Sequence, residues 1–234
     1  MGKWHLGDNA PCRPQDKGFQ DVVWHKGGGI GQAPDHYGND YFDDTYERYQ
    51  NGKTTLEKFD GYCTDVFFEE SIRFVEENKD NPFLLYISTN APHSPYWVDE
   101  KWADVYRDVV KWKHGAEFYG MISNLDYNLG LLRKKLKDLN LSNDTILIFM
   151  TDNGTAKGGR ERPNAEGFHG FSAGMRGQKS TIFEGGHRVP FFIHYPAGGF
   201  SGGHDRKQLA SHIDILPTLA EICEVSTGDT FLDG

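Results

Sequence analysis

Short apolar runs alternate with helical periodicities along this chain, and that alternation constrains the fold more than any other feature. The runs cover residues 83–88, 145–150 and 189–195, and their length and polar boundaries predict buried strands. Patterns with helical period, over residues 64–78 and 114–139, predict helices between them. Strands that alternate with helices are typical of an α/β fold, in which a parallel sheet carries helices on its faces.

The predicted helices each have an apolar side. Thr64 is expected to cap the first of them, where Phe68, Ile72 and Val75 fall on one stripe. A last helix is expected over residues 214–225, with a proline tolerated in its first turn. The long helix has the clearest stripe, which predicts a face packed into the core: Phe118, Met121, Ile122, Leu125, Leu129, Leu132, Leu136 and Leu139.

Composition excludes several classes of protein. The chain has 25 basic and 34 acidic residues, for a net charge of −9, which argues against nucleic acid as a partner. It lacks any run of about 18 apolar residues, so no membrane partner is expected. The three cysteines are widely separated and form neither a disulfide framework nor a zinc pattern. Within residues 8–60, which are rich in Gly, Asp, Asn and Tyr, the stretches 27–29 and 37–44 predict long ordered loops.

Polar residues cluster near the ends of the predicted strands, where α/β sheets carry their chemistry. Lys3 and His5 are two positions apart, so on a strand they would share a face. His93 lies between two prolines, and Asp152 and Asn153 follow an apolar run with the hard oxygen ligands that Ca²⁺ or Mg²⁺ prefers. Each has an ordinary alternative: a frayed terminus, a capped loop histidine, or an Asp-Asn-Gly turn.

A further cluster of cations comprises Arg176, Lys179 and Arg188, which lie among glycines. Alone it is explained equally well by a solvated basic patch. Together, the histidines, the lysines and the oxygen-ligand pair indicate an anion site beside a divalent metal. Such a site suits hydrolysis of a sulfate or phosphate ester, because cations stabilise the charge that develops on oxygen.

Five motifs, in order along nearly the whole chain, resemble those of the type I sulfatases, the formylglycine-dependent, arylsulfatase-like branch of the alkaline phosphatase superfamily. The resemblance implies an alkaline-phosphatase-like α/β fold with a mixed, mostly parallel sheet flanked by helices. It also implies sulfuric ester hydrolysis. The motifs are Gly2-Lys3-Trp4-His5-Leu6-Gly7, Ala91-Pro92-His93-Ser94-Pro95, Thr151-Asp152-Asn153-Gly154, Arg176-Gly177-Gln178-Lys179 with Glu184-Gly185-Gly186-His187-Arg188-Val189-Pro190, and Asp214-Ile215-Leu216-Pro217-Thr218.

The same resemblance implies roles for individual residues. Asp152 and Asn153 would supply part of a Ca²⁺ shell. The oxygens of the sulfate would be bound by Lys3, His93 and Lys179. Either Lys179 or His93 would help the leaving oxygen to depart.

The resemblance implies other roles for three further residues. His5 would hydrogen-bond the nucleophile and act as the base when sulfate is released. Arg176 and Arg188 are expected to pack and form salt bridges beside the site.

The sequence departs from the family at the nucleophile. The family makes formylglycine from the Cys or Ser of C/S-x-P-x-R, and Cys12 begins a segment that lacks the arginine and follows the Lys-Trp-His motif instead of preceding it. We therefore reject Cys12 as the nucleophile. The family's N-terminal Asp-Asp metal ligands are also missing, since Asp43 and Asp44 lie in the wrong part of the order.

Residues 1–234 are therefore expected to be the central part of a single sulfatase catalytic domain, truncated at both ends, and inactive alone. Two alternatives stay open: a phosphoesterase or phosphonate hydrolase of the same superfamily, and a non-catalytic sulfate-binding remnant. The expected partner is a small-molecule or glycan sulfate ester. Specificity among such esters is expected to come from loops such as residues 18–60 and 155–172. Family members are often periplasmic, secreted or lysosomal.

Overall fold

The computed structural model describes residues 1–32, 35, 37–156 and 170–234. These residues fall into two compact units, Met1–Phe200 and Ser201–Gly234. The predicted specificity loop over 155–172 lies mostly outside the described residues. The second unit contains a 3₁₀ turn, η4 (His212–Asp214), and the helix α5 (Ile215–Ile222). This helix is shorter than predicted, and its proline lies in the first turn, as expected.

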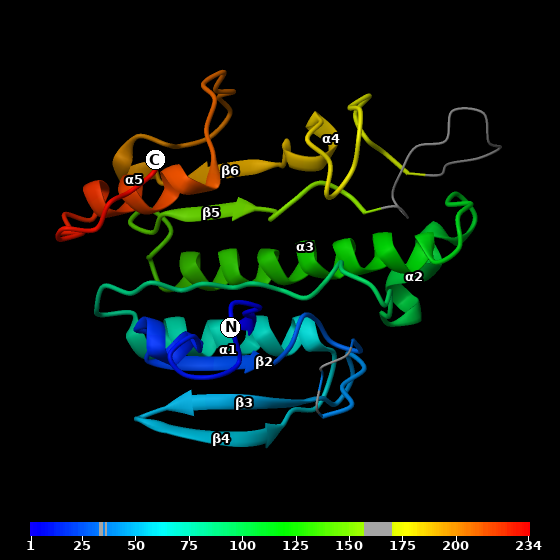
Figure 1. Ribbon diagram of the computed structural model, residues 1–234, viewed down its shortest axis with the longest axis horizontal. Helices are drawn as coiled ribbons and strands as arrows, with labels where there is room; N and C mark the ends of the chain where they lie inside the picture. Colours follow the sequence, from blue (N-terminus) through cyan, green and yellow to red (C-terminus); the bar gives the residue numbers. More distant parts are fainter. Residues whose placement is uncertain (33–34, 36, 157–169) are drawn as a thin grey trace. The chain divides into compact units, whose positions relative to one another are not determined.

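The main sheet of the first unit has the strand order β1-β2-β3-β4 (Figure 1). Its strands are β1 (Gly2–Lys3), β2 (Asp21–His25), β3 (Thr45–Gln50) and β4 (Lys53–Lys58). The short 3₁₀ turn η1 (Pro14–Lys17) precedes β2. The predicted loops over residues 27–29 and 37–44 lie outside these strands, although three strands that were not predicted lie within residues 8–60.

A second, two-stranded sheet pairs β5 (Leu147–Met150) with β6 (Phe191–His194) in antiparallel orientation. Both strands are shorter than predicted and only partly buried, with Phe192 64% exposed. Among the strand pairs of the described residues, β1–β2 alone is parallel, so a mostly parallel sheet was a wrong prediction. An apolar run predicts a strand, but it does not specify which strand pairs with it or in which direction.

Residues 83–88 are extended, but they do not form the predicted buried strand. They join the main sheet at one bridge, where Ser88 pairs with Gly2, because β1 is only two residues long. Side chains alternate along this segment, and Leu84 and Tyr86 are exposed. One face of the segment packs inward and the other remains open.

The two predicted helices of the first unit form and lie side by side (Figure 1). They are α1 (Cys63–Asn78) and α3 (Gly115–Asp138), and their apolar faces form a cluster of Phe68, Val75, Leu132 and Leu136. Thr64 is buried inside α1 and does not cap it, because the helix begins one residue earlier. The helices α2 (Glu100–Arg107) and α4 (Glu184–His187) and the turn η3 (Pro196–Gly198) were not predicted.

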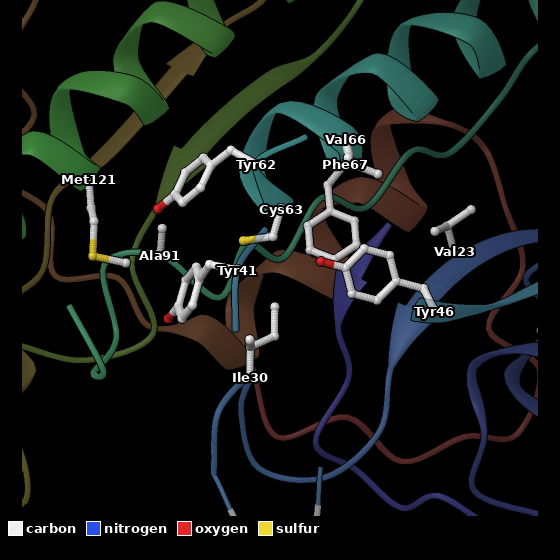
Figure 2. Close-up of a cluster of buried hydrophobic side chains, with 10 residues drawn as sticks. All are labelled: Val23, Ile30, Tyr41, Tyr46, Tyr62, Cys63, Val66, Phe67, Ala91 and Met121. Atoms are coloured by element: carbon white, nitrogen blue, oxygen red, sulfur yellow. The ribbon is translucent and has the colours of Figure 1, made fainter. Parts of the chain in front are cut away.

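A second cluster of ten buried residues joins the main sheet to the loop that carries His93 (Figure 2). Tyr41 and Ala91 belong to this cluster and are adjacent to the site described below. The helix interface also contains polar groups, because Asn124 and Asn128 of α3 each donate to Asp65 Oδ1 at 2.7 Å. Paired in this way, they carry no desolvation penalty for an unmade hydrogen bond. Within the described residues, every helix is too short or too polar to cross a bilayer.

Candidate functional site

β1 fixes Lys3 between two neighbouring segments. Its backbone pairs with His25 of β2 on one side, and Lys3 N donates to Ser88 O at 2.6 Å on the other. Gly2 permits this approach, because a Cβ atom at Gly2 would overlap Ser88 O. The Lys3 side chain is therefore anchored at its base and only partly exposed.

His5 does not share a strand face with Lys3, as the spacing had predicted. β1 ends at Lys3, and His5 has a left-handed backbone with φ of 57°. Its ring lies against Gly28, where a Cβ atom would come within 3.1 Å of His5 Nε2. The hydrogen bonds and ion pairs of the described residues do not join His5 to His93 or Lys179. The structure therefore places the His5 ring against the glycine loop that follows β2.

The loop of His93 is held by a chain of hydrogen bonds from the core. His93 N donates to Asn90 O at 2.9 Å, and Tyr41 Oη donates to His93 O at 2.8 Å. Asn90 Nδ2 in turn donates to Tyr41 Oη. Tyr41 and Asn90 are both buried, so the backbone of His93 is fixed against the interior of the first unit.

The imidazole of His93 meets two groups at the same nitrogen. Nδ1 lies 2.9 Å from Gln32 Nε2 and 2.7 Å from Ser94 O. Gln32 Nε2 also donates to Ser94 O at 2.9 Å. An amide nitrogen only donates, so the Gln32 contact requires an unprotonated Nδ1, whereas a bond to Ser94 O requires a protonated one. The two contacts therefore favour opposite tautomers: Gln32 favours a proton on Nε2, and Ser94 O favours a proton on Nδ1.

The predicted metal ligands and Lys179 are held together by backbone hydrogen bonds. The pair Asp152–Asn153 directly follows β5, as predicted, and Lys179 lies on the turn before α4. Gly154 N donates to Gly186 O at 2.9 Å, and Lys179 N donates to Thr155 O at 2.8 Å. We call this pair of bonds the backbone clasp. It joins the backbone of the segment after Asp152 and Asn153 to the backbone around Lys179.

Four of the predicted site residues interact through their charges: Lys3, His93, Asp152 and Lys179. Burial lowers the pKa of Lys3, Asp152 raises it in part, and Lys179 lowers it further. Burial also lowers the pKa of His93. The contact with Ser94 O opposes this effect, the charges of Lys3 and Lys179 lower the pKa further, and Asp152 raises it. The site thus combines two lysines, an imidazole that favours its neutral form, and one carboxylate. Such a group can bind an anion and donate a proton to it.

The two arginines have different surroundings. Arg188 forms an ion pair with Glu184 at 3.2 Å. Arg176 places its guanidinium over the ring of Phe183, with 3.7 Å between Cζ and the ring centroid. Both arginines are exposed.

The residues after β5 fit part of a Ca²⁺ shell. The Asp152 carboxylate is exposed, and Asn153 uses its amide nitrogen to donate to Gly154 O at 2.9 Å, which leaves the side-chain oxygen as a donor to a cation. Ca²⁺ takes about six to eight oxygen ligands, so these two residues supply a minority of them. The described residues contain no group of three or more His, Cys, Asp or Glu that would hold a metal.

Comparison with known proteins identifies the family. A family model described as Sulfatase matches residues 1–225. The chain belongs to the sulfatase family. A crystal structure of Ps i-CgsB in complex with k-i-k-neocarrahexaose is similar in fold, with a TM-score of 0.79 and 29% identity over 97% of this chain and 51% of that one. This sulfatase therefore has the alkaline-phosphatase/sulfatase-like α/β fold that its motifs implied.

Curated relatives are also sulfatases. The uncharacterized sulfatase YdeN of Escherichia coli (strain K12) is 28% identical over 100% of this chain and 42% of its own length. Arylsulfatase J of Mus musculus is 28% identical over 100% of this chain and 38% of its own length. The chain thus spans less than half the length of these relatives.

Sequence reasoning missed the residues that position His93. Gln32, Asn90 and Tyr41 belong to none of the recognised motifs, although Asn90 directly precedes Ala91-Pro92-His93. Their roles depend on contacts across 49 to 61 positions of sequence, between Tyr41 and Asn90 and between Gln32 and His93. Neither spacing nor composition carries such information.

Proposed function

We propose that the protein to which these residues belong hydrolyses sulfate esters, and that this chain supplies the anion-binding side of its active site. The observation that carries the proposal is the backbone clasp, which holds the turn of Lys179 against the segment that follows Asp152 and Asn153. The charges of Asp152 and Lys179 also act on Lys3 and His93. Membership of the sulfatase family supports the same reaction. In this role Lys3, His93 and Lys179 bind the sulfate oxygens.

Proton transfer falls to the imidazoles and to Lys179. Gln32 supports the His93 tautomer that carries its proton on Nε2, which suits donation to the departing oxygen. Lys179 assists the same oxygen by its charge or its proton. His5, whose ring lies against the glycine loop, hydrogen-bonds the nucleophile and accepts a proton when sulfate is released.

The family implies two further groups, a bound Ca²⁺ ion and a formylglycine. Both need residues beyond those named so far. Asp152 and Asn153 are proposed ligands of Ca²⁺, which supplies positive charge to the reacting oxygens when bound. Formylglycine supplies the nucleophile, and the 234 residues contain no C/S-x-P-x-R motif from which to make it. This chain alone is therefore proposed to bind sulfate esters without hydrolysing them.

The substrate class is a sulfated small molecule or glycan. The neocarrahexaose in the complex of Ps i-CgsB shows that a related protein binds an oligosaccharide, which favours a glycan here. The missing nucleophile motif keeps a second candidate in place, a sulfate-binding protein without catalysis.

Calorimetric titration of the chain with sodium sulfate in the presence of Ca²⁺ tests the anion site. Lys179→Ala should weaken binding by about tenfold, the loss of one charge-assisted contact. Arg133→Ala, which removes an equal charge from the exposed side of α3, should leave binding unchanged. Equal affinity of the wild type and Lys179→Ala would overturn the assignment of the anion site.

Activity on 4-nitrophenyl sulfate and 4-nitrophenyl phosphate separates the enzymatic candidates. The reading frame extended upstream to include a C/S-x-P-x-R segment is expected to hydrolyse the sulfate faster than the phosphate. The 234-residue chain should hydrolyse neither. Turnover by this chain that survives Cys12→Ala would refute the account of the missing nucleophile.

A further inference from the structure

His5 and His93 lie on separate segments that both contact the glycine loop, residues 27–32. His5 follows β1, and His93 lies on the loop after residues 83–88. Among the hydrogen bonds of the described residues, none joins His5 to His93 directly. The glycine loop is therefore the shared neighbour of the two histidine segments.

Two successive glycines allow this double contact. A Cβ atom at Gly28 would lie 3.1 Å from His5 Nε2, and one at Gly29 would lie 3.1 Å from Asn90 Oδ1. Both distances are tighter than an ordinary van der Waals contact of a Cβ atom. The loop thus packs closely against the His5 ring at one residue and against the start of the His93 segment at the next.

The glycine loop is held in place at two further points. Ile30 is fully buried in the cluster that also contains Tyr41 (Figure 2). Gly27 N donates to both carboxylate oxygens of Asp8, at 3.1 and 3.2 Å, and Asp8 is three residues after His5. The segment of His5 is therefore tied to the loop by hydrogen bonds as well as by packing.

Asn90 connects the same loop to His93. Its side-chain oxygen accepts from Ile30 N at 3.4 Å, and its side-chain nitrogen donates to Tyr41 Oη. Tyr41 Oη donates to His93 O at 2.8 Å, and His93 N donates to Asn90 O at 2.9 Å, which closes a ring of hydrogen bonds. Asn90 is 2% exposed, so water does not replace either side-chain bond. One buried amide thus bonds to the glycine loop on one side and to the support of His93 on the other.

A common frame for the two imidazoles matters for the proposed chemistry. His93 donates a proton in one step and His5 accepts one in another, so both rings must be placed correctly around the same sulfur. A displacement of about 1 Å in such a group can reduce a rate by about a hundredfold. Support of both rings by one buried residue keeps their separation constant.

We propose that Asn90 is a positioning residue for both imidazoles, acting on His5 through the glycine loop and on His93 through Tyr41. This inference rests on the proposed function, because it assigns His5 and His93 to one site. Both rings should respond to a change at Asn90, whereas a change at Tyr41 should affect His93 alone.

Nuclear magnetic resonance of the histidine ring nitrogens, on the 234-residue chain with isotope-labelled histidine, tests the positioning without a ligand. Asn90→Ala removes the acceptor for Ile30 N and the donor to Tyr41, so it should displace the signals of both His5 and His93. Tyr41→Phe should displace the signals of His93 and leave those of His5 in place.

Two side chains outside the site provide matched controls. Asn124→Ala removes a buried amide that donates to Asp65 Oδ1 at 2.7 Å. Tyr106→Phe removes a hydroxyl that lies 2.6 Å from Ser123 Oγ. Neither variant should displace the signals of the two site histidines.

A second variant keeps the test valid if Asn90→Ala does not fold, which thermal unfolding of each variant establishes. Gly29→Ala would press a Cβ atom against Asn90 Oδ1 from the side of the loop, so it should also displace the signals of both His5 and His93.

Calorimetric titration with sodium sulfate in the presence of Ca²⁺ relates the positioning to the anion site. Asn90→Ala should weaken sulfate binding about fivefold in the chain that contains His93, because a misplaced ring loses its contact. In the His93→Ala chain the same change should have no effect. Equal weakening in both chains would show a general structural role for Asn90 and overturn the proposal.

The ring signals can also overturn the proposal. They do so if Asn90→Ala displaces His93 alone, if Tyr41→Phe displaces both rings equally, or if Asn124→Ala displaces either ring. Failure of the proposed function looks different. Lys179→Ala would then bind sulfate as the wild type does, while both rings would still respond to Asn90→Ala.

Discussion

The buried imidazole of His25 should make the stability of the fold depend on pH, and His25→Phe should remove this part of the dependence. His25 is 1% exposed, and its ring packs against Tyr46 and Phe67 with centroid separations of 6.5 and 6.3 Å. Its Nε2 atom has no partner among the described residues. Burial lowers the pKa of His25 from 6.5 to about 4.

The sign follows from proton binding. Between pH 4 and 6.5 the unfolded chain binds a proton at His25 and the folded chain does not, so a lower pH favours unfolding. This contribution to stability is complete above pH 6.5 and is lost as the pH falls towards 4. A difference of about 2.5 pKa units corresponds to about 3 kcal/mol.

Asp44 acts in the opposite direction over part of the same range. Burial raises the pKa of its carboxyl from 3.8 to about 6, so the folded chain binds more protons there than the unfolded chain. This contribution weakens the fold as the pH rises towards 6 and partly masks the effect of His25 in the wild type. The difference between the wild type and His25→Phe removes the Asp44 contribution, because both proteins carry it.

Urea unfolding of both proteins across this pH range provides the measurement. Relative to His25→Phe, the wild type should lose about 3 kcal/mol between neutral pH and pH 4. His204→Phe, a change at an exposed histidine of the second unit, should keep the wild-type dependence. Parallel pH profiles for the wild type and His25→Phe would refute the reasoning.

Two further predictions concern the site and its support. Gly154→Ala should destabilise the chain by about 1–3 kcal/mol, because the new Cβ atom would overlap Gly185 O, whereas Gly130→Ala, in open space on α3, should stabilise it by about 0.5–1 kcal/mol. Urea unfolding measures both, and a stabilising Gly154→Ala would contradict the packing of the backbone clasp. Gln32→Leu should raise the pKa of His93, because it removes a donor to the neutral ring. Nuclear magnetic resonance titration of the ring measures this shift, and a lowered pKa would disprove the role of Gln32.

The helices could be predicted from sequence because their evidence is local. The apolar stripes of α1 and α3 recur within each segment, and both helices form within one residue of the predicted bounds. Asp152 and Asn153 were likewise predicted at the end of a strand, and β5 places them there. In each case neighbouring residues contain the whole pattern.

The β3–β4 hairpin shows where the sequence evidence was present but overlooked. Asn51 and Gly52 have φ of 52° and 76°, the left-handed pair that a tight two-residue turn requires. Their dipeptide is a strong hairpin indicator, but β4 is almost entirely exposed, so it has no apolar run to mark it as a strand. A prediction based on buried strands could not find it.

Strand pairing and the support of His93 could not be predicted for a different reason. The antiparallel pairing of β5 with β6 and the contact of Gln32 with His93 both depend on the approach of segments that are far apart in sequence. Motifs identify which residues belong to the site. They do not identify the neighbours that fix the protonation of those residues.

The backbone clasp has a thermodynamic consequence for the proposed site. Because Asp152 and Lys179 are joined through Gly154 and Thr155, a cation held by the first and an anion held by the second contact one small hydrogen-bonded frame. Ordering of that frame by either ligand reduces what the other has left to order. The two affinities are therefore linked, and the linkage is reciprocal, so that sulfate should tighten the hold on Ca²⁺ by the same factor as Ca²⁺ tightens the hold on sulfate.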